Sequence, residues 1–438
     1  MMSDKGLTIS ATRKKMRFLI PDRLLAGVRL VLTFGALMVA ETDTGAATTP
    51  WVVIKCKFSD QPDQPAFDPL FITGTAYGMA AYWSEVSYGQ ISLNGSAVYP
   101  GNGEWYTLPL TLAQAQSFSP ATRRKQIIDA CIAAAPANVN VPDFYSVIAI
   151  LNVPIDSGSD GSRVLLDPKA WNVSFAVHEM GHVYLDDPAF EDHSFDDSQT
   201  IYCPGYKPGE YGDGWDIMSA MTFGGSNPAF TGVFGASGPG LHAHNLDKMG
   251  WIPANRILTW DYTPETLTLA ALNRPLASGY LMAKVPLEAA NPNHYYTVEF
   301  RRKTDWDQGI PRDTVLIHEV RPNGVCYLIR ANGGPERLQD QTFRDVNNNV
   351  AITVLNIDAL SSTATINIGR NEVWVDFNAS GPFEFGTFTF PYKTLAEGLT
   401  TIAYNGTLKI KAGSANETAA ISRKMRIEAY GGPVTIGR

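Results

Sequence analysis

The amino-acid sequence predicts an α+β domain, followed by a β-sandwich-like domain and a short β-solenoid-like tail. In the first half of the chain, a buried strand at residues 145–153 precedes a helical segment at residues 169–185. Short alternating segments separated by turn residues fill residues 258–369, and still shorter apolar segments follow from residue 371. Of the 438 residues, 45% are hydrophobic and 18% are charged, so we expect folded domains rather than disorder.

The first 47 residues are predicted to form a signal peptide or leader. Basic residues at positions 13–23 precede an apolar run at 30–40, and the small residues at 45–47 suit a cleavage site. The apolar run is shorter than a membrane-spanning helix requires, and no other stretch is long and apolar enough to span a bilayer. We therefore expect an exported protein, secreted or at the cell surface, with no membrane span once the signal is removed.

Residues 48–254 are predicted to form the α+β domain. A strand at residues 51–58 opens this domain, and residues 121–135 have the apolar spacing of a helix. The helical spacing ends near residue 253, which places the domain boundary there. The four cysteines form no C-x-x-C pair, which argues against a structural zinc site of the cysteine type. In an oxidising compartment they allow up to two disulfides, with three pairings open.

The most informative motif is H-E-M-G-H at residues 178–182. On a helix, His178 and His182 are four positions apart, so both imidazoles project from one face and can bind one zinc ion. Glu179 lies beside them, where a carboxylate can take a proton from water that the metal activates. The sequence therefore predicts a zinc site with Glu179 as general base.

The residues around the motif favour a helix. Asp167 is suited to the N-cap and Pro168 to the first helical position, and Gly181 is the only Gly or Pro within residues 169–185. A strand, a loop and then this helix is a layout that suits an active site. The alternative is a core helix with two incidental histidines, but two His and one Glu on a buried helix would need polar partners.

The third zinc ligand is less clearly marked in the sequence. A catalytic zinc usually has three protein ligands, and metzincins continue the motif with a Gly and then a His or Asp at three-residue intervals. Here Leu185 and Pro188 occupy those positions, and proline has no ligand atom in its side chain. If one residue is missing, Asp187 becomes the third ligand. The alternatives are Asp186, Glu191 and His193.

The acidic stretch after the helix has a second interpretation, a solvated loop or a Ca²⁺ site. Carboxylate oxygens are the hard ligands that calcium prefers. Five aspartates supply them: Asp186, Asp187, Asp192, Asp196 and Asp197. Further along the chain, Asp345, Asn347 and Asn349 alternate like a calcium loop, but the remainder of such a motif is missing and we expect a hairpin turn there.

A methionine-containing segment follows the helix at residues 213–221. In metzincins a turn of this kind forms an apolar floor beneath the zinc. Met218 is the candidate Met-turn residue, and Met221 is the alternative. Taken alone, a methionine in a turn is more often a core residue, but its position after H-E-x-x-H favours the Met-turn interpretation.

Four stretches of the chain resemble the immune inhibitor A family of secreted bacterial zinc metallopeptidases. In the family's order they are residues 82–95 with Trp105-Tyr106, residues 178–182, residues 215–219 and residues 247–252. The likeness spans about residues 50–255, and we expect it to continue through the β-rich region to about residue 370. It implies a metzincin-like catalytic domain, a zinc cofactor, export, and cleavage of protein or peptide substrates.

By this resemblance, each chemical role falls on a residue of this chain. His178 and His182 match the zinc ligands, Glu179 the general base and Met218 the Met-turn residue. The chain departs from the family's pattern after His182, where the Gly is missing and the acidic residue is shifted.

The second half of the chain is predicted to contain strands and turns. Residues 255–370 form a β-rich accessory domain, with strands at 295–300, 315–320 and 350–355. Residues 371–438 form a β-solenoid-like module, because short apolar segments are separated by Gly and Asn turns.

Two other functions stay open from the sequence. One is a catalytically degenerate homologue that acts as a surface or binding protein, and the other is a zinc hydrolase of a non-peptide substrate. The net charge of −8 argues against a nucleic-acid partner. The oligomeric state is not indicated by any pattern in the chain.

Overall fold

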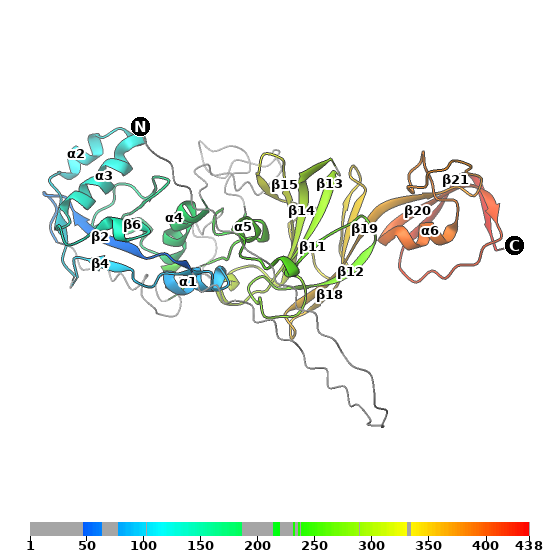
Figure 1. Ribbon diagram of the computed structural model, residues 1–438, viewed down its shortest axis with the longest axis horizontal. Helices are drawn as coiled ribbons and strands as arrows, with labels where there is room; N and C mark the ends of the chain where they lie inside the picture. Colours follow the sequence, from blue (N-terminus) through cyan, green and yellow to red (C-terminus); the bar gives the residue numbers. More distant parts are fainter. Residues whose placement is uncertain are drawn as a thin grey trace, which may run out of the picture. The chain divides into compact units, whose positions relative to one another are not determined.

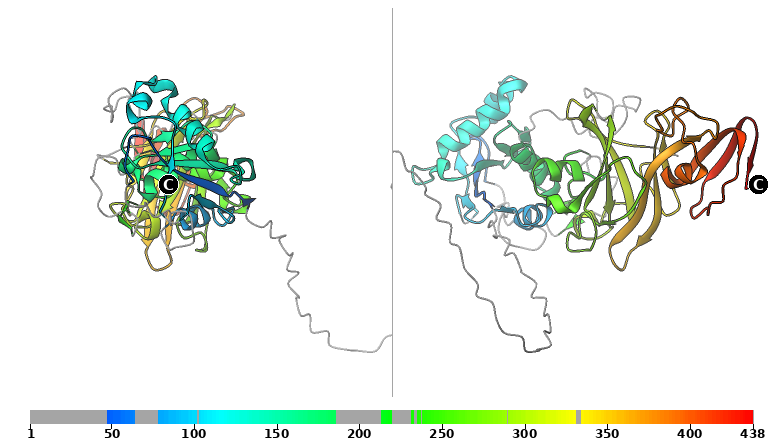
Figure 2. Two further views of the ribbon diagram at one scale, coloured as in Figure 1. Left: turned by 90° about the vertical axis from the view of Figure 1, so that its left-hand side faces the viewer. Right: turned by 45° about the vertical axis from the view of Figure 1, so that its right-hand side comes forward.

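The computed structural model describes residues 47–63, 78–101, 103–185, 213–219, 231–232, 235–236, 238–288, 290–330 and 334–437 (Figures 1 and 2). These residues belong to one compact unit. The predicted mixture of helices and sheets is confirmed, and more residues lie in strands than in helices. The predicted signal peptide, except for residue 47, lies outside the described residues.

The first sheet contains six strands in the order β4-β2-β6-β8-β7, with β5 also paired to β2. Its central strands are β2 (Trp51–Lys57) and β6 (Ser146–Leu151), which run parallel in the register Trp51↔Ser146 to Cys56↔Leu151. The remaining strands are β4 (Ala97–Tyr99), β5 (Tyr106–Thr107), β8 (Val164–Leu166) and β7 (Gly158–Ser159). Only β7 pairs antiparallel, and it lies at the end of the sheet.

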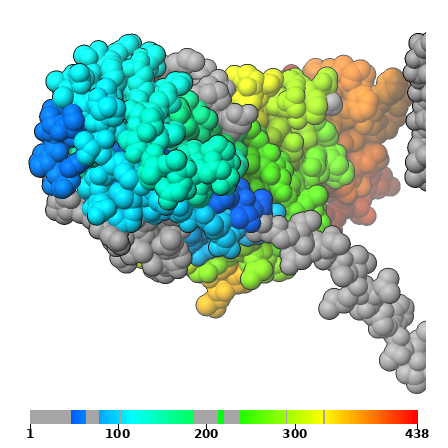
Figure 3. All heavy atoms as spheres, turned by 60° about the vertical axis from the view of Figure 1, so that its left-hand side comes forward, coloured from blue at the N-terminus to red at the C-terminus, as the bar shows by residue number. Residues whose placement is uncertain are grey.

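Helices pack on both faces of this sheet, which explains why β2 and β6 are apolar along their whole length. Helices α1 (Met79–Val86) and α4 (Val173–Leu185) share one hydrophobic cluster with Trp51 and Val53. Helices α2 (Leu112–Ser117) and α3 (Pro120–Ala134) share the opposite cluster with Val52 and Ile54. The α2–α3 side forms part of the molecular surface seen in Figure 3, in cyan.

Short elements complete this part of the chain. They are β1 (Ala47–Thr48) paired with β3 (Ile91–Ser92), η1 (Val141–Asp143), β9 (Thr231–Gly232) paired with β10 (Gly235–Ala236), α5 (Ala243–Lys248) and η4 (Ala254–Arg256). None of the helices in the described ranges is long and apolar enough to cross a membrane.

Helix α4 begins later than predicted. Asp167 does act as a cap, because its side chain accepts a hydrogen bond from the Lys169 amide, but it caps the short 3₁₀ helix η2 (Pro168–Ala170). The α-helix starts at Val173, after Asn172, whose side-chain oxygen accepts from the Phe175 amide at 2.9 Å. Asp167 is therefore a capping residue, as predicted, but the predicted start of the α-helix at residue 169 was wrong by one turn.

The second half of the chain forms two further sheets. One has the order β11-β13-β14-β15-β16, and the other has the order β17-β18-β19-β20-β21, with β12 paired to β19. The first contains β11 (Ile257–Thr259), β13 (Met282–Glu288), β14 (Asn291–Arg301), β15 (Thr314–Val320) and β16 (Cys326–Leu328). The second contains β12 (Glu265–Ala270), β17 (Thr342–Asp345), β18 (Val350–Asp358), β19 (Thr363–Val375), β20 (Ile402–Ala415) and β21 (Arg426–Ile436).

Side chains from both sheets meet in one hydrophobic cluster. The cluster includes Val298 and Phe300 of β14 together with Ile352 of β18 and Ile366 of β19. The turn between β17 and β18 is a hairpin, as expected, and the Asp345 carboxylate accepts hydrogen bonds from two amides within it. The two sheets therefore enclose a common core.

The end of the chain continues one of these sheets in a regular way. Strands β19, β20 and β21 pair in parallel and in sequence, so that Val373, Leu408 and Ile427 lie in one row. Helix α6 (Leu395–Thr401) packs on Val373 and Leu408 in a separate hydrophobic cluster. Strand β21 continues through the Gly pair at 431–432, because an irregularity in the register with β20 accommodates these two residues.

The core beneath α4 extends past the predicted domain boundary at residue 254. The cluster that contains α1 and α4 also includes Leu272, Leu281 and Trp306 from the β-rich half. Tyr82 of α1 stacks edge-on against Trp306 at 5.1 Å between ring centroids. Burial of apolar surface therefore joins the first sheet to the β-rich half.

Candidate metal centre

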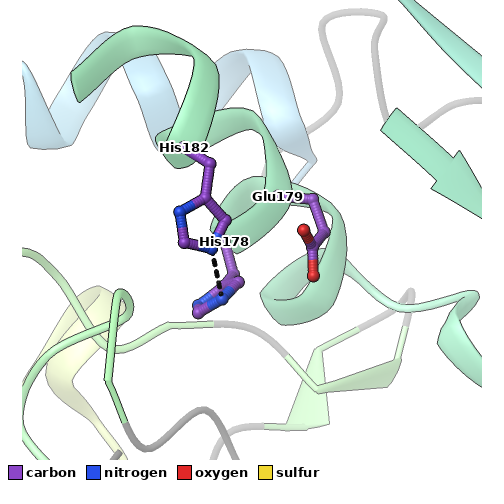
Figure 4. A group of neighbouring side chains, drawn as sticks. All are labelled: His178, Glu179 and His182. Carbon is purple, nitrogen blue, oxygen red and sulfur yellow. Dashed lines mark hydrogen bonds between the residues drawn. The ribbon is translucent and has the colours of Figure 1, made fainter. Parts of the chain in front are cut away.

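Helix α4 places His178 and His182 on one face, as the spacing predicts. Their Nε2 atoms lie 3.1 Å apart, and both side chains are buried (Figure 4). Glu179 is the next residue along the helix, so its carboxylate leaves the helix in a different direction from the imidazoles (Figure 4). Potential ligand atoms of all three residues lie within 4.8 Å of one another.

The tautomer of His178 follows from its backbone partner. Its Nδ1 lies 2.7 Å from the carbonyl oxygen of Ile217, and a carbonyl can only accept a hydrogen bond, so Nδ1 carries the proton. In the neutral ring the lone pair is then on Nε2, the atom that faces His182. The turn that contains Ile217 thus prepares His178 to bind a metal through Nε2.

The two imidazoles fit a zinc ion. Nitrogen ligands bind zinc at about 2.0–2.1 Å, and two nitrogens 3.1 Å apart can both lie at that distance from one ion. Without an ion, two imidazole nitrogens at this separation would need a shared proton. The predicted third ligand, Asp187, lies outside the described residues, as do the alternatives Asp186, Glu191 and His193 and the whole acidic stretch considered for calcium.

Glu179 is enclosed by protein. Burial raises the pKa of Glu179 from its usual value to about 7, although the positive charge of Arg124 and a hydrogen bond from the backbone of Ser159 both oppose this rise, while Asp156 adds to it. A cation bound to His178 would lower the pKa again. A carboxyl group that titrates near neutrality is suited to accept and return a proton.

A loop beside Glu179 is held by an arginine from the opposite face of the sheet. The guanidinium group of Arg124 in α3 donates to the carbonyls of Ser157 and Ser159 at 2.9 and 2.7 Å and pairs with Asp156 at 3.0 Å. Ser159 in turn donates its backbone N–H to Glu179. Arg124 therefore fixes the strand segment that partners the proposed base.

Met218 lies directly beneath the motif helix. A side chain at Gly181 would place its Cβ only 2.2 Å from the Met218 sulfur, so the Met218 side chain packs against the helix where a methyl group would displace it. Met218 itself is buried. The described structure thus brings Met218 next to the histidines, while Met221 lies outside the described residues.

The residues that sequence reasoning missed lack a local signal. Arg124 is one of three consecutive basic residues on a helix, and no feature of the sequence separates it from its neighbours. Ser159 acts through its backbone, which any residue could supply. Both depend on contacts that form only when α3, the loop and α4 fold together.

A cleft of about 1080 Å³ lies elsewhere on the molecule. It is bordered by the end of α1, the segment 272–277 and η5 (Asp305–Asp307). No residue of the motif lines it. The candidate chemistry on α4 is therefore separate from this cleft.

Comparison with known proteins adds no family to these observations. No family model matches the chain, and no curated protein sequence matches it.

Proposed function

We propose that the chain is an exported zinc-dependent endopeptidase with a metzincin-like catalytic domain. The observation that carries this proposal is the pair of buried imidazoles whose Nε2 atoms are 3.1 Å apart, with His178 held in the metal-binding tautomer by Ile217. The buried carboxyl group of Glu179 beside them supplies a base. Met218 beneath Gly181 matches the position of a Met-turn residue.

The residues of the chain divide the proposed chemistry among them. His178, His182 and an acidic residue, Asp187 by the sequence argument, would hold the zinc ion. Bound there, zinc would supply Lewis acidity that lowers the pKa of water and polarises a substrate carbonyl. Glu179 takes a proton from the attacking water and delivers it to the leaving amine. The backbone of Ser159 and the charge of Arg124 keep this carboxyl group able to ionise near neutral pH.

Zinc content and casein hydrolysis, measured on the same purified protein, test the proposal. Wild type is expected to hold one zinc per chain and to lose proteolysis on chelation. Glu179→Gln is expected to keep its zinc and lose about 10²- to 10⁴-fold in turnover, because only the proton transfer is removed. The exposed residue Glu104 provides a matched control, and Glu104→Gln should leave both measurements unchanged.

The other outcomes assign other functions. Zinc without peptide-bond cleavage would indicate a hydrolase of non-peptide substrates, and neither zinc nor cleavage would indicate a binding protein. Asp187→Ala tests the third ligand. Loss of zinc in this variant would support Asp187, whereas full retention would move the assignment to Asp186, Glu191 or His193.

A further inference from the structure

The turn at residues 213–219 is attached to the β-rich half of the chain at its first residue. The Asp213 carboxylate lies 2.9 Å from Nε2 of His318 in β15, and both side chains are almost completely buried. Burial raises the pKa of Asp213, but His318, His242 and the backbone amide of Trp215 together lower it below its usual value. Asp213 is therefore ionised and relies on His318.

A second histidine holds the middle of the same turn. The Asp216 carboxylate lies 3.1 Å from Nε2 of His242, again with both side chains buried. Nδ1 of His242 accepts a hydrogen bond from the Asn245 amide at the start of α5, so Nε2 is the protonated nitrogen and donates to Asp216. Asp216 also accepts from the Asn245 side chain at 3.3 Å.

Strand β14 holds the segment that carries His242. Glu299 accepts from the Ala243 amide at 2.6 Å and pairs with Arg301 at 3.2 Å. Arg301 also pairs with Asp307, which accepts from the Gly240 amide at 3.0 Å. Figure 1 shows α5 between α4 and the strands of this sheet.

These hydrogen bonds connect the β-rich half of the chain to the candidate metal centre through the turn 213–219. Ile217 follows Asp216 in the turn, and its carbonyl accepts a hydrogen bond from Nδ1 of His178 in helix α4 at 2.7 Å. The Ile217 amide donates to the carbonyl of Gly240 at 3.2 Å, so the same peptide segment is fixed from both directions. The orientation of the His178 ring therefore depends on the turn, and the turn depends on two buried histidines.

We propose that His318 and His242 are positioning residues of the metal centre, which hold the turn 213–219 so that the Ile217 carbonyl keeps His178 in its metal-binding orientation. This inference rests on the metal site of the proposed function. It makes the sheet that contains β14 and β15 a structural part of that site. Partners that orient a metal-binding histidine typically change metal affinity 10- to 100-fold when they are removed.

Substitution of His318 tests the proposal, with zinc affinity and the absorption spectrum of bound Co²⁺ as readouts. His318→Gln keeps a donor at the position of Nε2, whereas His318→Asn, of similar size, cannot reach Asp213. We expect the Asn variant to bind zinc 10- to 100-fold more weakly with an altered Co²⁺ spectrum, and the Gln variant to recover most of the loss. His294 lies on β14 of the same sheet and pairs with Glu288 of β13 and Glu319 of β15. The variant His294→Gln is therefore the control.

Thermal unfolding with and without zinc separates positioning from folding. If the role of His318 is purely structural, the metal-free Asn variant will melt at a lower temperature, but zinc will raise its melting temperature as much as it raises that of wild type. Equal zinc affinities in the Gln and Asn variants would overturn the proposal. If His318→Asn does not fold, Asp213→Ala, which removes the acceptor for His318, provides the second test of the same bond. We expect the same loss of zinc affinity, and a wild-type zinc affinity would overturn the proposal.

The two proposals fail in distinguishable ways. Tight zinc binding by wild type without casein cleavage would contradict the peptidase and leave the positioning role intact. Absence of zinc binding by the folded wild-type protein would contradict both.

Discussion

Glu179 is the ionisable group on which the proposed chemistry depends most directly. It is buried next to the two histidines, and its nearest balancing groups are the Ser159 amide and the more distant charge of Arg124. Without a metal ion, this environment favours the neutral carboxyl group. The stability of the metal-free protein should therefore depend on pH because of this one residue.

We expect the metal-free protein to lose stability between about pH 4.5 and pH 7 because of Glu179. The folded protein holds the proton up to a pKa of about 7, whereas the unfolded chain releases it near the usual value of 4.5, so the folded state binds more protons in this interval and its stability falls as pH rises. At about 1.4 kcal/mol for each pH unit, the loss is about 3 kcal/mol.

Urea unfolding in the presence of a chelator measures this effect. Glu179→Gln should be more stable than wild type at pH 8 by about that amount, and the difference should vanish near pH 4. With zinc bound, the advantage of the variant should shrink, because the cation stabilises the carboxylate. Parallel stability curves for the two metal-free proteins would contradict the raised pKa.

The contact between Gly181 and Met218 gives a second prediction. Gly181→Ala should destabilise the protein by about 1–3 kcal/mol, because the new methyl group would lie 2.2 Å from the Met218 sulfur and push helix and turn apart. Gly214→Ala is the matched control, since a Cβ at Gly214 would meet no atom within 4 Å. Chemical denaturation compares the two variants, and equal stabilities would show that Met218 moves aside without cost.

The residues of the site differ in how far the sequence alone could predict them. His178, Glu179 and His182 were predictable because helix geometry converts a spacing of four into a common face. The roles of Arg124 and His318 were not, because each acts through a partner more than thirty residues away in the chain. Such contacts are a property of the tertiary fold and leave no local pattern.

Helix α3 affects the proposed site only through the loop that it holds. Arg124 binds two carbonyl groups and one carboxylate of residues 156–159, and a Cβ at Gly158 would lie 2.4 Å from its guanidinium group. The loop therefore closes tightly around this one side chain. Its backbone then reaches Glu179 from the neighbouring element.

We expect Arg124→Met to reduce kcat/KM for a peptide substrate by about tenfold or more, because a loop held less firmly positions Ser159 and Glu179 less well. Zinc content should stay at the wild-type value, since Arg124 contacts neither histidine. Lys125→Met is the control, because Lys125 is more exposed and forms a salt bridge with Asp129 on its own helix. An unchanged kcat/KM in Arg124→Met would show that the loop keeps its place without the arginine.

The elements themselves were predictable where burial is continuous or strictly periodic. Strands β2 and β6 were found because helices cover both faces and make them apolar throughout. Helix α6 was not predicted, although Thr394 and Glu397 form a capping box that the sequence displays. It has few apolar residues, and the segments around it have strand-like patterns, which favoured strands over a helix.

At the level of the complete chain, the β-rich half and the first sheet share buried structure. The cluster under α4 contains Leu272, Leu281 and Trp306, and the hydrogen bond between Asp213 and His318 crosses between the two halves. By contrast, helix α6 and strand β20 pack with the end of β19 in a separate cluster. The sequence pattern changes as clearly near residue 254 as near residue 370. These changes indicate where secondary structure changes, but they do not indicate which parts of the chain share a buried core.

Shortened chains should therefore behave differently. A chain that ends at residue 254 is expected to lose zinc binding and cooperative unfolding, because it lacks Trp306 and His318. A chain that ends at residue 376 should keep a zinc affinity within about threefold of wild type, because the metal centre and its supporting strands remain intact. Zinc titration calorimetry and near-ultraviolet circular dichroism measure both, and a zinc-binding fragment ending at residue 254 would contradict the expectation.

The bond between Asp213 and His318 joins residues that are 105 positions apart, and this separation bears on the timing of maturation. A chain that emerges from the ribosome or from an export channel presents its H-E-M-G-H motif long before His318 is available. At about 5–20 residues per second, the delay is several seconds or more. The proposed peptidase, with a metal centre that depends on a late strand, would stay inactive until most of its length has been released, and this delay would protect the machinery that makes and exports it.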